Sequence, residues 1–165
     1  MTKPFIVEEG EHEGKSFRGA YFFGDPSSFL LKQVQAVCFT GDDRVVLFRF
    51  KDGKAGCPGG SVESGESVEE ALRREILEEA NCELLDFGPT GYVQVEDLNS
   101  GRTFYQGRYW ALVKPLEGEV RDPVQKSKER ILVSLEEAPE VLGWGKKGES
   151  LIAEGYRRFR EKHDE

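Results

Sequence analysis

The sequence predicts one α/β domain, built on a mixed β-sheet that helices cover on both faces. Two observations support this prediction: β-rich runs lie on either side of one central amphipathic helix, and a second helical pattern closes the chain. A third is the length of 165 residues, which suffices for one hydrophobic core and is too short for two complete ones. We therefore expect residues 1–165 to form a single domain.

The composition excludes several classes of function. Hydrophobic residues make up 38% and charged residues 33% of the chain, as in a soluble globular protein. A formal net charge of -8 argues against binding to the nucleic-acid backbone as the main task. No apolar run approaches the roughly 20 residues of a membrane span, and the N-terminus lacks the apolar segment of a signal peptide. We therefore expect a cytoplasmic protein that binds neither nucleic acid nor membrane.

Residues 1–33 precede the main fold as an N-terminal extension. Two apolar patches, at residues 5–7 and 17–23, flank a polar stretch, which favours an extra strand or hairpin. Five of the eleven Phe residues fall in this segment, so it is not a disordered tail. We expect these rings to contact the core or a second copy in a homodimer; the alternative is a platform on which a nucleobase stacks.

Four β-rich runs form two predicted hairpins, one before and one after the central helix. Residues 34–40 and 44–50 are joined by a Gly-Asp-Asp turn, and residues 83–96 and 102–114 are joined at Asn-Ser-Gly. Short polar turns of this kind between β-rich runs are typical of antiparallel neighbours.

The central helix is predicted to begin near Ser67, after a glycine-rich turn. Ser67 and Glu70 have the spacing of a capping box, and Glu69 adds a second carboxylate near the positive end of the helix dipole. Apolar residues recur along one side of the helix: Val68, Leu72, Ile76 and Ala80. The helix is therefore amphipathic.

The C-terminal part of the chain alternates between loops and regular structure. Residues 115–127 are polar and contain a proline, so we expect an exposed loop. Residues 129–135 resume a short strand, and residues 139–148 are expected to form a second loop. Residues 149–162 carry apolar residues at helical spacing and predict the closing helix.

Three carboxylates lie on one side of the central helix, next to its apolar side. Glu75, Glu78 and Glu79 stand at i, i+3 and i+4, where like charges repel by roughly 0.2–0.5 kcal/mol per pair. A divalent cation would offset that repulsion, and oxygen ligands of this kind suit Mg²⁺ or Mn²⁺. The alternative is an acidic helix face in contact with solvent, which is ordinary in a chain with 31 Asp and Glu residues. The fixed spacing of glycine, arginine and glutamates around the three residues favours the metal site.

The stretch from Gly60 to Cys82, GSVESGESVEEALRREILEEANC, resembles the Nudix box, G-x5-E-x7-R-E-U-x-E-E-x-G-U, in which U is a bulky aliphatic residue. Every charged position matches. Asn81 replaces the closing glycine, and asparagine is the non-glycine residue that most readily adopts the left-handed conformation at a helix end. Cys82 replaces the last aliphatic residue and can fill the same apolar space. Residues 60–82 are thus a Nudix-like box with an intact metal face.

The resemblance implies a fold and an activity. The fold is the Nudix-type α/β/α sandwich, in which a mixed sheet lies between the box helix and the C-terminal helix. The activity is hydrolysis, dependent on Mg²⁺ or Mn²⁺, of the phosphoanhydride of a nucleoside diphosphate linked to another group. A nucleoside triphosphate and a nucleotide sugar are both open as the small-molecule substrate.

The same resemblance assigns roles to residues of the box. Glu75, Glu78 and Glu79 would bind the metal. Glu66 and Arg74 would form a structural ion pair. The loop at Gly59 and Gly60 would let the phosphates approach the backbone without obstruction by side chains.

The identity of the general base is open among four carboxylates. Glu75 and Glu129 are catalytic candidates, and Glu96 and Asp97 are two further ones, because in this family a loop can deliver the base. For Glu129 the alternative is a surface charge paired with a neighbouring lysine.

A second class of function is a non-catalytic Nudix domain that binds a nucleotide as a sensor or scaffold. Such a domain would be expected to have lost carboxylates of the box, and all are present here. The sequence therefore favours an enzyme.

The cysteines Cys38, Cys57 and Cys82 are an odd number without the spacing of a zinc site, so we expect reduced thiols. Cys57 lies next to Pro58 at the edge of the predicted site. It either lines the pocket or is a buried thiol, and alkylation distinguishes the two.

Overall fold

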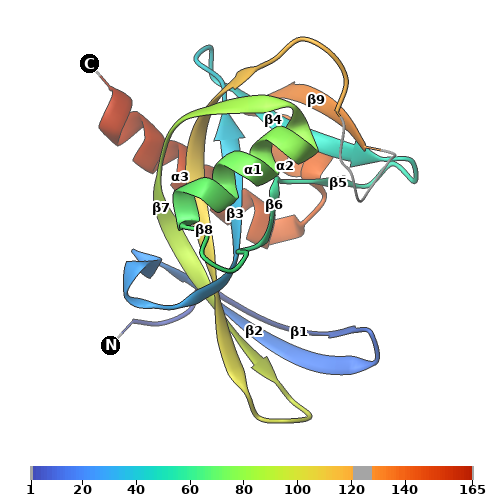
Figure 1. Cartoon of the computed structure of the whole chain (residues 1–165), viewed down its shortest axis with the longest axis vertical. Helices are drawn as coiled ribbons and strands as arrows, with labels where there is room; N and C mark the ends of the chain where they lie inside the picture. Colours follow the sequence, from blue (N-terminus) through green and yellow to red (C-terminus); the bar gives the residue numbers. More distant parts are fainter. Residues whose placement is uncertain (1, 121–127, 165) are drawn as a thin grey trace.

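The computed structural model describes residues 2–120 and 128–164. In these ranges a nine-stranded sheet has the order β1-β2-β7-β8-β3-β4-β5, with β6 paired to β3 and β9 paired to β4 (Figure 1). The strands are β1 (Ile6–His12), β2 (Lys15–Phe23), β3 (Leu31–Phe39), β4 (Arg44–Phe50), β5 (Ala55–Gly56), β6 (Gly59–Ser61), β7 (Cys82–Asp97), β8 (Thr103–Pro115) and β9 (Lys128–Ser134). The helices are α1 (Val68–Ala80), α2 (Ala138–Leu142), α3 (Gly145–His163) and the short 3-10 helix η1 (Pro26–Ser28). Because β3 and β8 run parallel and the other described pairs are antiparallel, the sheet is mixed, as predicted.

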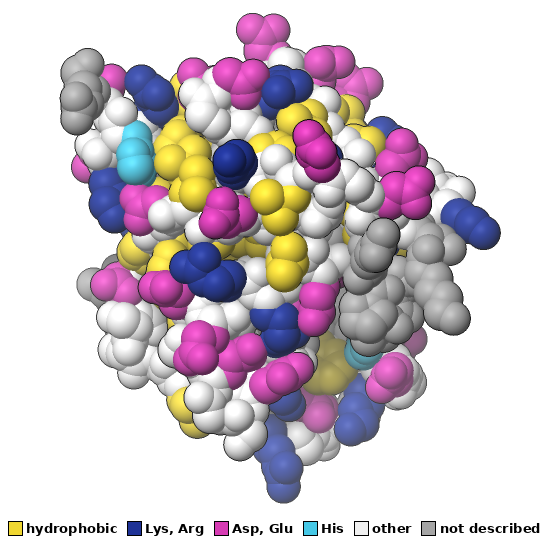
Figure 2. Space-filling model, turned by 45° about the horizontal axis from the view of Figure 1, so that its top comes forward, with side chains coloured by type: hydrophobic (Ala, Val, Ile, Leu, Met, Phe, Trp, Pro, Cys, Tyr) yellow, Lys and Arg dark blue, Asp and Glu magenta, His cyan; other side chains and the backbone are white. Residues whose placement is uncertain are grey.

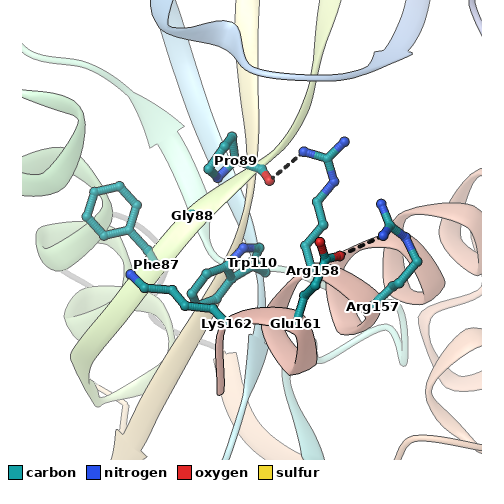
Figure 3. A pocket seen from close by; sticks show the side chains of 8 residues that line it. All are labelled: Phe87, Gly88, Pro89, Trp110, Arg157, Arg158, Glu161 and Lys162. Atoms are coloured by element: carbon teal, nitrogen blue, oxygen red, sulfur yellow. Dashed lines mark hydrogen bonds and ion pairs between the residues drawn. The ribbon is translucent and has the colours of Figure 1, made fainter. Parts of the chain in front are cut away.

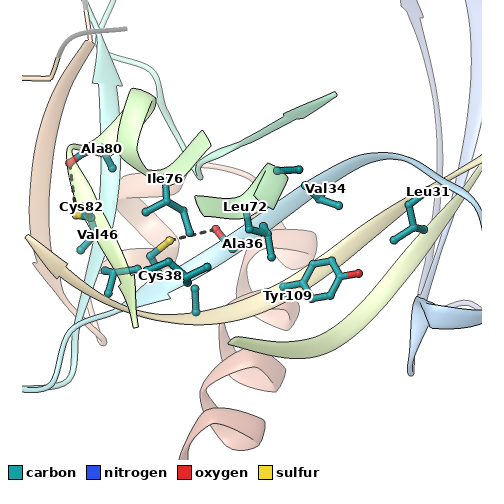
Figure 4. Close-up of a cluster of buried hydrophobic side chains, with 14 residues drawn as sticks. Leu31, Val34, Ala36, Cys38, Val46, Leu72, Ile76, Ala80, Cys82 and Tyr109 are labelled. Carbon is teal, nitrogen blue, oxygen red and sulfur yellow. Dashed lines mark hydrogen bonds between the residues drawn. The ribbon is translucent and has the colours of Figure 1, made fainter. Parts of the chain in front are cut away.

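Helices cover both faces of the sheet, and the alternation of side chains along β3 shows how. Val34, Ala36 and Cys38 belong to the core cluster beneath α1, which Figure 4 shows. Val37 and Phe39 point the other way and pack with α2 and α3. In Figure 1, α1 lies in front of the sheet and α3 behind it. The predicted α/β/α sandwich is therefore confirmed.

Burial of one side of α1 fixes the direction of its carboxylates. Leu72 and Ile76 are fully buried against the sheet, and each contributes roughly 1.5–3 kcal/mol relative to an exposed side chain. Because Glu75, Glu78 and Glu79 stand on another side of the same helix, they are presented at the edge of this core.

The ends of α1 have the predicted geometry. The Ser67 hydroxyl accepts a hydrogen bond from the Glu70 N–H, and the Glu70 carboxylate accepts one from the Ser67 N–H, both at 3.1 Å. The helix ends at Asn81 in the left-handed conformation, with φ 48° and ψ 52°. The capping box and the asparagine in place of glycine are both confirmed.

The N-terminal extension forms the predicted hairpin. β1 pairs with β2, and β2 pairs with the second half of β7, so the sheet continues into an arm formed by β1, β2 and the ends of β7 and β8 (Figure 1). The aromatic side chains of the extension pack against rings of the same chain: Phe5 stacks on Phe23 at 4.0 Å and Phe29 on Tyr105 at 4.2 Å between ring centroids. Contact within the chain is thus the interpretation that the structure supports.

Three sequence-based expectations need correction or lie partly outside the described residues. The first hairpin is short, because β3 pairs with β4 only at Cys38 and Phe39. On its other residues β3 pairs with β6 at positions 33–35, and it pairs with β8 along its whole length. The loop expected at residues 139–148 is wrong: these residues include most of α2 and the start of α3. Pro139 is tolerated in the first turn of α2, where its missing N–H costs no hydrogen bond. Of the expected loop at 115–127, residues 121–127 lie outside the described residues.

Acidic and basic side chains are interspersed on the face that Figure 2 shows, with hydrophobic side chains between them. Among the helices of residues 2–120 and 128–164, none combines the length and the apolar character that a membrane span requires.

Candidate active site

The predicted metal face lies along α1, between β6 and β9. Glu79 is buried, with 8% of its surface exposed. The side chains of Glu75 and Glu78 are 12% and 31% exposed. Carboxylates at this depth need hydrogen bonds or counter-charges, and each of the three has at least one cationic neighbour.

Glu79 joins three elements of the fold. One carboxylate oxygen accepts a hydrogen bond of 2.7 Å from the backbone N–H of Gly59 on β6. The other contacts the ammonium of Lys128 on β9. Only 3% of the Lys128 side chain is exposed, and its ammonium lies over the rings of Phe48 and Phe50, at 4.6 and 5.4 Å from their centroids. Glu79 therefore holds β6, α1 and β9 together.

Glu75 is the carboxylate with an unusual ionisation. Burial raises its pKa to about 7, an effect that Arg74 opposes and that Glu79 and Glu78 reinforce. Its Oε1 accepts a hydrogen bond of 2.8 Å from Arg74 Nη1. A carboxylate with a pKa near neutrality can both accept and release a proton at physiological pH.

Arg74 organises the loop that enters the helix. It donates two hydrogen bonds to Glu66, of 2.8 and 2.9 Å, and a third of 3.0 Å to the carbonyl oxygen of Ser61. The hydrogen bonds from Arg74, together with one of 3.0 Å from the Glu63 N–H, lower the pKa of Glu66 to about 2. The structure thus pairs Glu66 with Arg74 in the bidentate geometry that arginine favours with carboxylates. Arg74 also lies 3.6 Å from Glu78 and 3.8 Å from Glu63, so one guanidinium faces four carboxylates.

Gly59 and Gly60 allow β6 to approach both β3 and α1. A Cβ on Gly59 would lie 2.7 Å from the Cα of Gln35, and one on Gly60 would lie 2.7 Å from the carboxyl carbon of Glu75. A side chain at Gly59 would collide with the backbone of β3, and one at Gly60 would displace the Glu75 carboxylate. The N–H of Gly59 already serves Glu79, and the space beside Gly60 is filled by Glu75.

The donor set on α1 fits a hard divalent cation. The three carboxylates supply only oxygen ligands, which suit Mg²⁺ and Mn²⁺. Arg74 and Lys128 already form ion pairs with Glu75 and Glu79. The positive charges now beside these carboxylates are therefore those of basic side chains. Within the described residues, no three His, Cys, Asp or Glu side chains converge on one point as a preformed metal site. A metal would therefore have to replace contacts that the two basic residues now make.

The structure does not bring Glu129 to this face. Glu129 follows Lys128 on β9 and is exposed. Side chains alternate along a strand, and Ile131 packs with the cluster under α3, whereas Leu132 packs with the cluster under α1. Glu129 therefore shares the α3 side with Ile131, opposite the side from which Lys128 contacts Glu79. This placement disfavours Glu129 as the base.

The two other candidate bases lie in the arm. Glu96 is paired with Arg18 of β2 at 3.5 Å. Asp97 accepts hydrogen bonds from the N–H groups of Asn99 and Ser100 and so shapes the β7–β8 turn. Both stand at the end of β7 that extends away from α1 (Figure 1).

Cys57 is a buried thiol. Only 3% of the residue is exposed, and it packs in the cluster formed with α2 and α3. Burial raises its pKa to about 12. Of the two interpretations of Cys57, the structure confirms the buried one.

Two basic residues of β9 belong to the site and were missed from the sequence. Lys128 pairs with Glu79, and Arg130 donates hydrogen bonds of 2.8 and 2.9 Å to the carbonyl oxygens of Asn81 and Leu116. Arg130 thereby satisfies backbone acceptors at the negative end of α1. The sequence offered one indication of this: Lys128 and Arg130 are two positions apart in a β-rich run, which places both side chains on the same side of the strand.

A hollow of about 610 Å³ lies elsewhere, between β7 and α3 (Figure 3). Its cationic side chains are already engaged: Arg158 donates to the carbonyl oxygen of Pro89, and Arg157 binds Glu161. Glu161 is the sole acidic residue in its described lining. The hollow therefore lacks the carboxylates that the α1 face provides.

Comparison with protein families and curated proteins agrees with the motif. The NUDIX domain family model matches residues 30–154. Nucleoside triphosphatase NudI of Escherichia coli O139:H28 is 42% identical over 72 residues, which are 44% of this chain and 48% of the relative. NudI of Shigella flexneri matches to the same extent. The chain thus spans about half the length of the curated relatives it matches.

Solved structures resemble the chain over more of its length. The pyrophosphohydrolase BsRppH of Bacillus subtilis matches with a TM-score of 0.65 and 25% identity, over 94% of this chain and 97% of that one. The NUDIX domain of Shewanella oneidensis NrtR, solved as a complex with ADP ribose, matches with a TM-score of 0.59 and 21% identity, over 82% and 94% of the two chains. The second match supports the fold alone.

Proposed function

The chain belongs to the Nudix hydrolase family, and from this membership we propose that it hydrolyses the phosphoanhydride of a nucleoside diphosphate linked to another group. The proposed substrates are nucleoside triphosphates and nucleotide sugars, and the proposed cofactor is Mg²⁺ or Mn²⁺. The observation that carries the proposal is the row of Glu75, Glu78 and Glu79 on α1, beside the close approach of Gly59 and Gly60 on β6.

Glu75, Glu78 and Glu79 are the proposed metal ligands. When bound, the metal neutralises phosphate charge and lowers the pKa of a coordinated water. The protein's own contribution is to fix the ligands. Gly59 orients one oxygen of Glu79 through its backbone N–H, and Arg74 orients Glu75 while it is itself anchored by Glu66. Glu66 thus acts through Arg74 as a positioning residue.

Glu75 is the proposed general base. Its Oε1 holds Arg74, so Oε2 is the oxygen that takes the proton from the attacking water. A base with a pKa near the working pH is the most effective, and burial places the pKa of Glu75 at about 7. We prefer Glu75 to Glu129 because Glu129 points to the opposite side of β9.

A nucleotide-binding domain without turnover is the second candidate function. It is favoured by one observation: in the described part of the chain the metal face is neutralised by Arg74 and Lys128, and no preformed metal site is present. In this alternative the two basic residues would keep the face closed to metal, and the chain would act as a sensor or scaffold.

One experiment separates these proposals. The protein is incubated with a panel of nucleoside triphosphates and nucleotide sugars in Mg²⁺, and release of phosphate or pyrophosphate is followed for the wild type, Glu75→Gln and Glu129→Gln. We expect turnover of at least one substrate, a loss of about 10²-fold or more for Glu75→Gln, and little change for Glu129→Gln. A larger loss for Glu129→Gln would overturn the assignment of the base. Binding of a nucleotide without product from any substrate would favour the sensor or scaffold.

A further inference from the structure

Lys128 is a buried cation at the edge of the carboxylate face of α1. The strand that carries it, β9, lies beside the C-terminal end of α1 and pairs with β4 (Figure 1). Lys128 is the register partner of Phe50 on β4, and only 3% of its side chain is exposed. Its ammonium contacts one carboxylate oxygen of Glu79, Oε2. Moving an ammonium out of water is costly, and strand pairing does not require a lysine here, so the residue is a candidate for a role in binding.

Two aromatic rings hold the Lys128 ammonium in place. Phe48 and Phe50 meet edge to face, with 5.2 Å between their centroids, and the ammonium lies 4.6 and 5.4 Å from these centroids. The ring of Phe48 in turn rests on β5, because a Cβ on Gly56 would lie 2.6 Å from its Cζ. Cation–π contacts of this kind attract the ammonium independently of Glu79. Lys128 therefore keeps its charge beside the carboxylate face when Glu79 takes another partner.

The two basic residues of the face differ in what a bound metal would take from them. Arg74 keeps its bidentate pair with Glu66, which is not a proposed metal ligand. Lys128 shares Glu79 with the proposed metal, because its ammonium contacts Oε2 while the N–H of Gly59 holds Oε1. An ammonium and a divalent cation on one carboxylate repel each other. Lys128 therefore opposes the binding of a metal to Glu79.

We propose that Lys128 exchanges Glu79 for a phosphoryl oxygen of the substrate, so that the face binds metal and phosphate together and binds the metal alone weakly. This inference rests on the proposed metal site. A phosphoryl group supplies the anionic oxygens that a buried ammonium favours, and lysine binds phosphate as a point charge. The negative charge of the phosphoryl group also reduces the repulsion between the ammonium and the metal. Two ligands coupled in this way raise each other's affinity by the same factor.

The first measurement is the binding of Mn²⁺ alone, by isothermal titration calorimetry and by the electron paramagnetic resonance signal of free Mn²⁺. The full chain is used as wild type, Lys128→Met, Lys128→Gln, Lys128→Arg and Lys162→Met. The Met and Gln variants remove the charge of Lys128 and should bind Mn²⁺ about tenfold more tightly than the wild type, whereas the Arg variant keeps the charge and should differ little. Lys162 is the matched control: it pairs with Asp86 at 3.1 Å, and its ammonium lies 5.7 Å from the centre of the Trp110 ring. Its variant should bind Mn²⁺ as the wild type does.

The second measurement is the binding of phosphoryl groups at saturating Mn²⁺. The probes are methylenediphosphonate and α,β-methylene-ATP, whose methylene bridges resist hydrolysis. Lys128→Met and Lys128→Gln should bind each probe about tenfold more weakly than the wild type, and Lys128→Arg should lose less. A lysine with a purely structural role would not shift the affinities for metal and phosphate in opposite directions.

Thermal unfolding in EDTA and in Mn²⁺ provides a third readout. Lys128→Gln can still donate a hydrogen bond to Glu79, so this variant decides the test if Lys128→Met, which leaves the buried carboxylate without that partner, does not fold. Because tighter binding to the folded state raises stability, the increase in melting temperature on adding Mn²⁺ should be larger in Lys128→Gln than in the wild type.

Three outcomes would overturn the proposal. They are equal affinity of the wild type and Lys128→Gln for Mn²⁺ alone, equal affinity of these two proteins for both probes at saturating Mn²⁺, and no binding of either probe to the wild type in Mn²⁺.

Glu79→Gln distinguishes these failures from failure of the proposed function. If the wild type and Glu79→Gln bound Mn²⁺ equally, the metal site would be wrong, and the role of Lys128 with it. If Glu79→Gln weakened the binding of Mn²⁺ and Lys128→Gln left it unchanged, the role of Lys128 alone would be wrong. If both affinities shifted as expected and no nucleotide of the panel gave product, the role of Lys128 would hold and the hydrolase proposal would fail.

Discussion

Replacing Glu79 by Gln tests the metal face and the fold at one position. Glutamine keeps the shape and can still accept the hydrogen bond from Gly59, but it breaks the ion pair with Lys128, whose side chain is only 3% exposed. Breaking a buried ion pair costs about 3–5 kcal/mol. The retained hydrogen bond and the relief of repulsion with Glu75 and Glu78 reduce this figure, so we expect a loss of about 2–3 kcal/mol in the free energy of unfolding.

Lys128 provides the control for that expectation. If the loss comes from the broken ion pair with Lys128, the double variant Glu79→Gln with Lys128→Met should regain about 1–2 kcal/mol relative to the single variant. Urea unfolding in EDTA measures both, with circular dichroism as the probe. Turnover should fall by about 10²–10³-fold in the single and the double variant, because neither restores the carboxylate. A Glu79→Gln protein as stable as the wild type, or a double variant less stable than the single one, would refute the role of the pair.

Three further predictions concern other positions. Glu70→Gln should lower the free energy of unfolding by about 1 kcal/mol or less, because it weakens the cap of α1, and it should leave kcat nearly unchanged. Urea unfolding and a turnover assay measure the two effects. A loss of activity equal to that of Glu79→Gln would contradict the metal assignment. Arg157 and Arg158 hold the pKa of Glu154 at about 2, below its usual 4.5, so its pairing stabilises the protein above about pH 4.5 and the effect is lost as the pH falls through about 2. Glu154→Gln should therefore lower the free energy of unfolding by about 1 kcal/mol at pH 7 and by less toward pH 2. If the difference in unfolding free energy between the wild type and Glu154→Gln grew as the pH fell, the prediction would be wrong. Cys57 should resist iodoacetamide in the native protein and react after unfolding, which mass spectrometry detects; fast native labelling would show that the thiol is accessible.

The parts of the fold that were predictable are those encoded by neighbouring residues. Ser67 and Glu70 cap α1 through bonds that span three positions, and Asn81 ends it by its own backbone preference. The second hairpin followed from its turn. Glu66 and Arg74 are eight residues apart, and the family resemblance, not the local pattern, predicted their pairing.

What could not be predicted depends on pairings between distant strands. Lys128 reaches Glu79 because β9 pairs with β4, and β8 lies beside β3 through a parallel pairing. Parallel pairing leaves no turn signal in the sequence. The loop expected at residues 139–148 failed for another reason, since Pro139 and the glycines of that stretch are also the residues that begin and end short helices.

The central claim is that the carboxylate face of α1 hydrolyses phosphoanhydrides with a divalent cation. It is tested most directly by the rate of product release from the best substrate of the nucleotide panel, measured in Mg²⁺ and in excess EDTA, together with the melting temperature in both. The account predicts turnover in Mg²⁺, none in EDTA, and a melting temperature raised by Mg²⁺ in the wild type but much less in Glu79→Gln. Equal turnover in Mg²⁺ and EDTA would contradict it.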